Sequence, residues 1–442
     1  MLTYCLQNYR TMNFKRLVYF MGAITAAFLS SCKPTIDLPK QVKGNVDFTN
    51  YVAIGNSLTA GYEDGGLYLD GQINSYPNMI AGQLKAVGGG PFIQPLFTAA
   101  QKNGSGYLQL TGFTAAGLPL LDTVKTNLAI RGVSPLTGLY LYTKYTDPVN
   151  NLGVPGIRMS DLVDNTYGAK NPYLERLEKD AEVGTVGYPQ KVLEAKPTFF
   201  TSWLGNNDAL QYALSGGTYP PLTPVSAYQA IYTGFIGQLV ASGAKGVLGT
   251  IPNVTLIPYF NTKTVANILA AAQAGGAKVN ALYIRTGTGS VRAATSADLI
   301  VLSVDSIGMS HPGAQAALGP KGFSPYYPLN SNDVLDSAEV GLTEAAISGY
   351  NTAIAQIAAA NKLGLMDINE LLHRVQAGNY IIDGIPLNLG YITGGVFSLD
   401  GVHLTPRGYA MVANQYIAAI NLAYGSNISL VNPALYRAVK LP

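Results

Sequence analysis

The sequence has few charged residues, few histidines and almost no cysteine. Charged residues make up 12% of the 442 residues and hydrophobic residues 48%, whereas soluble domains typically carry about 25% charged residues. This balance excludes a disordered or highly charged scaffold. Arg10, Lys15 and Arg16 are the only charges before residue 32, so the rest of the chain is neutral overall. A concentrated basic face is not expected, which argues against nucleic acid as a partner.

The N-terminal segment has the pattern of a secretory signal. Lys15 and Arg16 precede an apolar run from residue 17 to residue 29, followed by small residues. This run is shorter than the roughly 20 residues that a spanning helix needs. The motif Leu29-Ser30-Ser31-Cys32 also resembles the lipobox of bacterial lipoproteins, in which cleavage before the cysteine precedes its lipidation. We therefore expect a signal peptide over residues 1–31 and a lipid anchor on Cys32.

The two cysteines leave no thiol for the folded body. Cys5 would be lost with the signal peptide, and the lipid would occupy Cys32. Disulfides, thiol nucleophiles and cysteine metal ligands are thus excluded from the remainder. Residues 32–47 read as a tether that holds the body at the membrane. The expected location is the bacterial cell envelope, on the periplasmic side or at the cell surface.

Four short apolar runs indicate buried strands. They cover residues 51–54, 198–204, 246–251 and 363–368. Three helical patterns accompany them: one opening at Thr223-Pro224 and ending near Gly243, one over about 338–360, and one opening at Thr405-Pro406. The first of these helices joins the second and third strands, so a parallel right-handed crossover is expected. The alternation predicts an α/β sheet with helices on both faces.

Two stretches interrupt this alternation. Residues 62–150 are rich in Gly, Tyr, Thr and Asn, and residues 256–335 combine an Ala-rich helical pattern with a Gly/Pro/Tyr-rich loop. We interpret both as large insertions around the strand ends, suited to a lid or a substrate wall. A single domain then extends over residues 48–442.

Polar residues that fit acyl transfer stand where strands are expected to end. Ser57 follows the first strand and Asn207 the second, while Asp400 and His403 precede the last helix. Such a reaction needs a hydroxyl, a base for its proton, a carboxylate that orients the base, and donors for the oxyanion. Ser57 supplies the hydroxyl, His403 the base, Asp400 the carboxylate, and the Asn207 amide a donor.

At these positions the chain resembles the SGNH (GDSL-type) hydrolase family. The resemblance assigns the nucleophile to Ser57 in Gly-Asn-Ser-Leu, and an oxyanion-hole glycine to Gly156 in the block over residues 151–156. It assigns Asn207 to the family's Gly-x-Asn-Asp block, and Asp400 and His403 to its Asp-x-x-His block. It implies a flavodoxin-like three-layer αβα fold with a mostly parallel sheet, ester hydrolysis through an acyl-enzyme, and no metal or organic cofactor.

The resemblance spans about residues 48–423, with two departures. Asn56 stands where the family usually has Asp before the serine. The triad acid is unaffected, because Asp400 supplies it. In addition, the first insertion separates the serine and glycine blocks by far more residues than in compact members. The mouth of the site therefore cannot be inferred from the family.

Other chemistries lack their residues. We find no Gly-x-Ser-x-Gly elbow, P-loop or Gly-x-Gly-x-x-Gly after a strand. Three histidines are too few and too scattered for a zinc site. Glu370 and His373, three residues apart, are best explained as a surface helix pair. His311 is a loop residue that would line the pocket only if the second insertion folds over it.

The sequence leaves the substrate open. The leading hypothesis is a lipid-anchored ester hydrolase, acting on a lipid, a short acyl ester or an acylated glycan. The second is an O-acetyl esterase or acetyltransferase of carbohydrates, because the 29 tyrosines would suit sugar stacking as well as ordinary packing. The third is a non-catalytic surface lipoprotein that binds a glycan or a partner. Trp203, the single tryptophan, lies in an expected buried strand and argues weakly against this third hypothesis.

Overall fold

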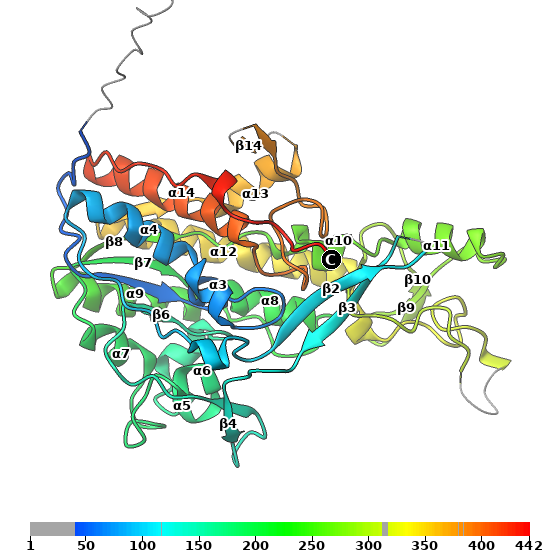
Figure 1. Ribbon diagram of the computed structural model, residues 1–442. Coiled ribbons are helices and arrows are strands. Elements are labelled where there is room, and N and C mark those ends of the chain that lie inside the picture. Colours follow the sequence, from blue (N-terminus) through cyan, green and yellow to red (C-terminus); the bar gives the residue numbers. More distant parts are fainter. Residues whose placement is uncertain (1–39, 116, 312–316, 379, 383) are drawn as a thin grey trace, which may run out of the picture. The chain divides into compact units, whose positions relative to one another are not determined.

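The computed structural model describes residues 40–115, 117–311, 317–378, 380–382 and 384–442 (Figure 1). Contacts divide the chain into Met1–Lys40 and Gln41–Pro442, and all described helices and strands belong to the second unit. The expected signal peptide, Cys32 and the first half of the expected tether lie outside the described residues. None of the described helices combines the length and the apolar character that crossing a membrane requires.

Five parallel strands form the central sheet. In the order β13-β8-β7-β1-β6 they are Gly364–Met366, Lys245–Gly249, Phe199–Trp203, Tyr51–Gly55 and Asn151–Gly153. Every neighbouring pair is parallel, with Ala53 of β1 opposite Thr201 of β7 and Asn151 of β6. Numbered along the chain, the spatial order is 2-1-3-4-5, which is the flavodoxin-like doubly wound order. The predicted α/β class with a parallel sheet is confirmed.

The four apolar runs all form strands of this sheet, but β6 was not predicted. Its three residues include Asn151 and Gly153, so neither an apolar run nor an alternation marks it in the sequence. The strand is held by pairing with β1 and by the side chain of Asn151, whose Nδ2 donates to the Thr59 carbonyl oxygen at 2.9 Å. A strand this short depends on its tertiary partners rather than on its own propensity.

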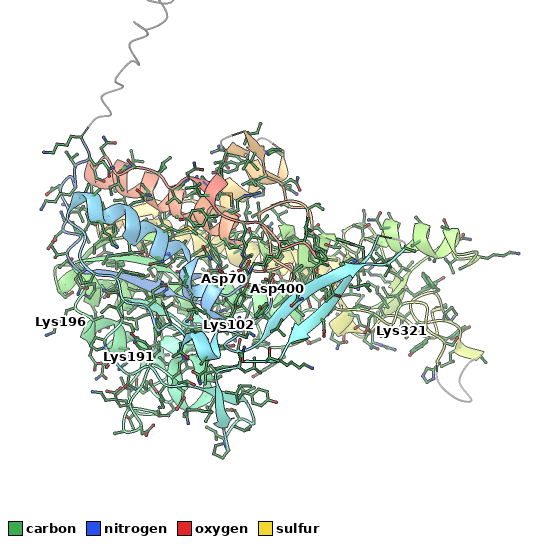
Figure 2. The ribbon with its side chains drawn as sticks, in the orientation of Figure 1. Asp70, Lys102, Lys191, Lys196, Lys321 and Asp400 are labelled. Carbon is green, nitrogen blue, oxygen red and sulfur yellow. The ribbon has the colours of Figure 1, made fainter. Side chains whose placement is uncertain are left out.

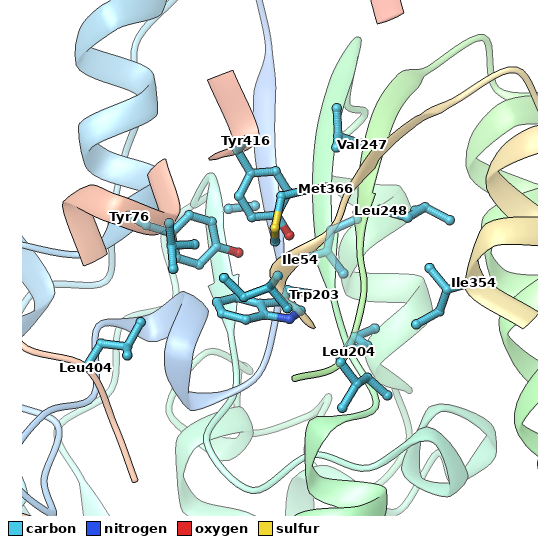
Figure 3. Close-up of a cluster of buried hydrophobic side chains, with 14 of the residues drawn as sticks. Ile54, Tyr76, Trp203, Leu204, Val247, Leu248, Ile354, Met366, Leu404 and Tyr416 are labelled. Atoms are coloured by element: carbon cyan, nitrogen blue, oxygen red, sulfur yellow. The ribbon is translucent and has the colours of Figure 1, made fainter. Parts of the chain in front are cut away.

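Helices cover both faces of the sheet. α4 (Tyr76–Leu84) packs against α14 (Pro406–Tyr424), and α14 also contacts β8 and β13. α9 (Val225–Ala241) packs against α12 (Ser337–Ala360), which likewise contacts β8 and β13. Figure 3 shows Tyr76 and Tyr416 of the first pair on one side of the strands and Ile354 of α12 on the other. The architecture is therefore three-layered, as predicted.

Side-chain caps set where the long helices begin. Thr405 caps α14, as predicted, because its Oγ1 accepts the Gly408 N–H at 3.1 Å. Asp336 caps α12 and forms a capping box with Glu339. α9 begins one residue later than expected, with Pro224 rather than Thr223 at the cap. Thr223 instead donates its hydroxyl to Asp208, at 2.6 Å.

Aromatic residues fill the core between the sheet and α4 and α14. Tyr76 and Tyr416 stack with ring centroids 5.1 Å apart, and Trp203 meets Tyr76 edge-on at 5.7 Å (Figure 3). The indole N–H of Trp203 donates to the Thr250 carbonyl oxygen at 2.9 Å. Burial of such large rings contributes strongly to stability, provided that their polar atoms find partners. Trp203 is 1% exposed, so the prediction that it lies in a buried strand is confirmed.

The interval 62–150 contains one helix of the main frame and two β-ribbons. α4 belongs to the helical layer described above. The ribbons pair β2 (Tyr107–Phe113) with β3 (Pro119–Val124) and β4 (Ile130–Val133) with β5 (Tyr140–Tyr142). The interval 256–335 adds α10 (Pro258–Asn261), α11 (Val265–Ala274), and the pairs β9 (Tyr283–Arg285) with β10 (Val291–Ala293) and β11 (Leu299–Ile300) with β12 (Val334–Leu335). Their use as a lid or substrate wall stays a prediction.

The remaining elements are short. They are α2 (Ser57–Ala60), α3 (Leu69–Ile73), α5 (Tyr167–Lys170), α6 (Pro172–Glu175), α7 (Tyr188–Glu194), α8 (Asn206–Leu214), α13 (Ile368–Gln376), β14 (Ile381–Ile382) and β15 (Ile385–Pro386). Two of them, α2 and α8, begin directly after β1 and β7, the strands between which the chain order reverses. Ligands of doubly wound folds bind at this reversal, outside the carboxyl ends of the strands.

Candidate active site

Ser57 stands at the carboxyl end of β1, as the first residue of α2. Asn56 caps this short helix, because its Oδ1 accepts the Leu58 N–H at 3.0 Å. The position that departs from the family pattern therefore has a structural role at the turn. The strand-to-helix turn directs the hydroxyl of Ser57 toward a segment almost 350 residues later in the sequence. Its Oγ lies 2.9 Å from Nε2 of His403.

His403 and Asp400 complete a chain of hydrogen bonds from the serine. Nδ1 of His403 lies 2.7 Å from Oδ2 of Asp400. Both residues belong to a tight loop before α14, closed by the Ser398 N–H donating to the His403 carbonyl oxygen at 2.8 Å. With the Nδ1 proton held by the carboxylate, Nε2 is left as the acceptor for the serine proton. The structure thus brings together three residues that the sequence singled out.

Asp400 is surrounded by donors that favour its ionised form. Its Oδ1 accepts the N–H groups of Val402 and His403 at 2.9 and 2.8 Å, and its Oδ2 accepts the Gly65 N–H at 2.8 Å. Burial opposes ionisation, yet the interaction with His403 and the hydrogen bonds from the backbone of His403 and Val402 hold the pKa of Asp400 below its ordinary value. The carboxylate therefore stays charged and able to orient the imidazole.

Tyr62 and Gly65, from the interval 62–150, contact His403 and Asp400. No sequence motif marks either residue. The ring of Tyr62 packs against the imidazole of His403 with centroids 4.5 Å apart. Gly65 supplies the N–H described above. Asp400 is labelled beside β2 in Figure 2, and the neighbouring Leu399 belongs to the same buried cluster as Leu110 of β2. Short sequence motifs give no signal for such contacts, because their partners lie more than 300 residues away.

Two buried acids, Glu63 and Asp64, precede Gly65 in the sequence. Asp64 accepts the Leu399 N–H at 2.9 Å and the Tyr68 hydroxyl at 3.0 Å. Burial, together with the neighbouring charge of Glu63, raises the pKa of Asp64 to about 7. Arg437 near the C-terminus pairs with Glu63 at 2.7 Å and thereby neutralises part of this charge. These contacts anchor the turn that presents Gly65 to the carboxylate of Asp400.

Gly156 and Asn207 belong to two segments that are tied together at the ends of β6 and β7. Nδ2 of Asn207 donates to the Ile157 carbonyl oxygen at 2.9 Å, and Nε2 of Gln211 donates to the Gly156 carbonyl oxygen at 2.8 Å. Asp208 accepts the Met159 N–H with both oxygens, at 3.1 and 2.9 Å. Three residues of α8 therefore fix the loop over residues 156–159.

Glycines make the turns of both segments possible. Gly156 has φ +86° and Gly205, which caps α8, has φ +101°, a region that other residues seldom adopt. A Cβ on Gly205 would also lie 2.5 Å from the hydroxyl oxygen of Tyr228. Among the hydrogen bonds of the described residues, none takes the backbone N–H of Gly156 or of Ser57. These two N–H groups and the second N–H of the Asn207 amide remain available as donors.

The carboxyl group of Asp208 is fully buried. Burial raises its pKa to about 6, although the Thr223 hydroxyl, the Met159 amide and the charge of Arg158 all favour the ionised form. The hydroxyl of Thr223 lies 2.6 Å from Oδ1. Asp208 is the last residue of the Gly-x-Asn-Asp block. Its contact with the loop over residues 156–159 is seen only in the structure.

A cavity lies beside the hydrogen-bonded chain of Ser57, His403 and Asp400. Ser57, His403 and Asn207 line it, whereas Gly156, His311 and His373 do not. His373 lies on α13 as predicted, and the ring of His311 packs against Tyr327. Over the described part of the chain, no group of three or more His, Cys, Asp or Glu side chains is arranged to hold a metal ion.

The chain belongs to the GDSL-like lipase/acylhydrolase family, whose model matches residues 51–416. It is accordingly a hydrolase of ester bonds. No significant match is found among curated proteins. The solved structures to which this chain is similar include a lipase/acylhydrolase from Enterococcus faecalis, at 12% identity and TM-score 0.33, covering 86% of this chain and 98% of the other. Another is a catalytic mutant of an acetylxylan esterase from Geobacillus stearothermophilus, at 12% identity and TM-score 0.35, covering 85% and 95%.

Proposed function

We propose that the chain hydrolyses esters through a covalent acyl-enzyme, with Ser57 as nucleophile, His403 as general base and acid, and Asp400 as the residue that orients the imidazole. One observation carries the proposal. The contacts of 2.9 Å from Ser57 to His403 and 2.7 Å from His403 to Asp400 join a hydroxyl, an imidazole and a carboxylate in the order that nucleophilic acyl transfer requires.

The proposed reaction has two balanced steps. In the first, Oγ of Ser57 attacks the ester carbonyl carbon while its proton passes to Nε2 of His403. The tetrahedral intermediate then breaks its bond to the alcohol oxygen, which takes the proton from the imidazole and leaves. In the second step, water gives a proton to His403 and attacks the acyl-enzyme, and the returned proton restores the Ser57 hydroxyl as the acid departs.

We assign the oxyanion hole to the N–H groups of Ser57 and Gly156 and to the Asn207 amide. The ties from α8 to the loop over residues 156–159 support this assignment, because they would hold the Gly156 N–H in place before substrate binds. Donors fixed in advance need no reorganisation when charge develops, which is the main way in which such a site lowers the barrier. No metal or organic cofactor enters the proposed reaction.

Covalent labelling tests the proposed nucleophile directly. A fluorophosphonate should phosphonylate Ser57, because attack of its Oγ on phosphorus displaces fluoride just as attack on an ester carbonyl displaces the alcohol. We expect one adduct per chain, located on Ser57 by mass spectrometry, and none on heat-denatured protein or on His403→Gln. A folded wild-type protein that takes up no label would contradict the proposal and favour a non-catalytic protein that binds a glycan or a partner.

We also propose that Cys32 carries a lipid that holds the enzyme at the bacterial cell envelope, on its periplasmic or outer side. The support is the Leu29–Cys32 motif behind a basic pair and an apolar run. Expressed in a bacterial host, the full chain should incorporate an alkyne-tagged fatty acid and sediment with membranes. Cys32→Ser should lose both properties, whereas Cys5→Ser, the matched control, should keep them. Lipid incorporation into Cys32→Ser would overturn this assignment.

A further inference from the structure

The cavity beside Ser57 enters the core rather than following the surface. Its lining includes Ser57, His403 and Asn207. The rest of its wall comes from elements of both the sheet and the helical layers: Trp203 at the end of β7, Leu372 on α13 and Val412 on α14 are examples. A group bonded to Oγ of Ser57 therefore has a path into this space.

Most of the residues that line the cavity are apolar. Thirteen of its eighteen lining residues have aliphatic, aromatic, thioether or proline side chains, among them Leu210, Ile257, Ile368, Phe397 and Met411. Trp203 presents only its ring, because its indole N–H is already bonded to the Thr250 carbonyl oxygen. Among the five polar residues that line the cavity, Asn206 has a buried Oδ1 without a hydrogen-bond partner in the described part of the chain and can accept one hydroxyl. The several hydroxyls of a sugar or of glycerol would still lose more hydrogen bonds to water than they regain here. The chemistry that fits is a hydrocarbon chain.

The size of the cavity limits that chain. Its volume is about 40 Å³, whereas an apolar cavity of about 150 Å³ accommodates the six carbons of benzene. On that scale the space beside Ser57 holds about two carbons beyond the carbonyl. Resting on the proposed acyl-enzyme mechanism, we propose that the substrates are esters of short, unbranched aliphatic acids of two to four carbons, whose alkyl end enters this cavity.

The acyl part, not the alcohol, is the part that fits this apolar space. After the first step the alcohol must leave and water must reach the same face of the carbonyl, so the leaving-group side has to communicate with solvent. The acyl group stays bonded to Ser57 through both steps, and burial of its alkyl end stabilises the intermediate by removing apolar surface from water. An apolar space that extends into the core is therefore suited to the acyl side.

The p-nitrophenyl esters of acids with two to twelve carbons test this proposal on the full-length wild-type protein, since they share one leaving group. Each methylene that the cavity buries should raise kcat/KM about fourfold, so kcat/KM should rise from acetate to propionate, whose two carbons beyond the carbonyl fill the cavity. It should then fall at least tenfold from butyrate to octanoate, because a longer chain must displace packed side chains or leave the cavity. Equal or higher kcat/KM for octanoate than for butyrate would overturn the proposal.

Two adjacent leucines of α13 provide a matched pair of variants. Leu372, 3% exposed, lines the cavity, whereas Leu371, 1% exposed, does not line it. Leu372→Ala should enlarge the cavity by about three carbons and raise the ratio of octanoate to butyrate activity at least tenfold. Leu371→Ala, with a similar loss of packing, should leave this ratio within twofold. A similar shift in both variants, or none in Leu372→Ala, would overturn the proposal.

A filling variant covers the case in which Leu372→Ala does not fold. Val412→Leu adds one methylene group to the wall and should lower the ratio of butyrate to acetate activity at least threefold; an unchanged ratio would count against the proposal. The dependence of hydrolysis on Ser57 distinguishes a wrong cavity assignment from a wrong mechanism. If hydrolysis requires Ser57 but shows no dependence on acyl length, only the cavity assignment is wrong. If folded protein hydrolyses none of the esters, or does so without Ser57, the proposed mechanism is wrong.

Discussion

Ser57→Ala should lower kcat for a short acyl ester at least 10⁴-fold. The variant lacks the oxygen that lies 2.9 Å from Nε2 of His403, so no acyl-enzyme can form and the imidazole has no hydroxyl to activate. Only the oxyanion donors and substrate binding would remain, and these give a small residual rate over water. Initial rates on p-nitrophenyl butyrate, with protein concentration corrected for folded fraction, measure the effect. The variant should also take up no fluorophosphonate.

Thr59→Val is the matched control for this substitution. Thr59 lies two residues further along α2, and its Oγ1 bonds to the Tyr76 hydroxyl at 2.9 Å in the core. Removing this hydroxyl at constant volume should cost about 1–3 kcal/mol of unfolding free energy, because the buried Tyr76 hydroxyl loses a partner. It should change kcat less than tenfold. If Ser57→Ala kept half of the wild-type activity, the nucleophile would lie elsewhere.

The central sheet was largely predictable because it is buried on both faces. Runs such as Tyr51-Val52-Ala53-Ile54 carry enough apolar residues to be recognised without any alternation, and Gly55 and Gly205 mark their ends. β6 lacked this signal, since its place is set by pairing with β1. The helix caps show both outcomes. The prediction of Thr405 from its own segment is confirmed, whereas the prediction of Thr223 is wrong, because Asp208 engages its side chain and Pro224 takes the cap position.

The functional residues divide in the same way. Ser57, Asn207 and His403 could be identified because each stands in a short motif next to a regular element. The residues that hold them could not: Tyr62, Gly65 and Gln211 act through contacts with distant segments and have no motif of their own. Short local motifs therefore identify the residues that would carry out the chemistry. The contacts that hold these residues in position come from distant segments and are seen only in the structure.

Asn207→Ala is expected to reduce kcat about 10²–10³-fold with little change in KM, equivalent to about 3–4 kcal/mol of transition-state stabilisation. The ground-state carbonyl gains little from the Asn207 amide, whereas the oxyanion of the intermediate gains a full hydrogen bond. Steady-state kinetics on p-nitrophenyl acetate and butyrate separate the two parameters. A loss below fivefold would remove Asn207 from the oxyanion hole.

Asn207 also holds the loop over residues 156–159, because its Nδ2 donates to the Ile157 carbonyl oxygen at 2.9 Å. Gln211→Met separates the two roles, because Gln211 ties the same loop through the Gly156 carbonyl oxygen at 2.8 Å but does not line the cavity. Loosening the loop alone should lower kcat less than tenfold, since the Asn207 amide stays in place. If Gln211→Met lost as much activity as Asn207→Ala, the effect of Asn207 would be explained by positioning of Gly156, and its amide would not be an oxyanion donor.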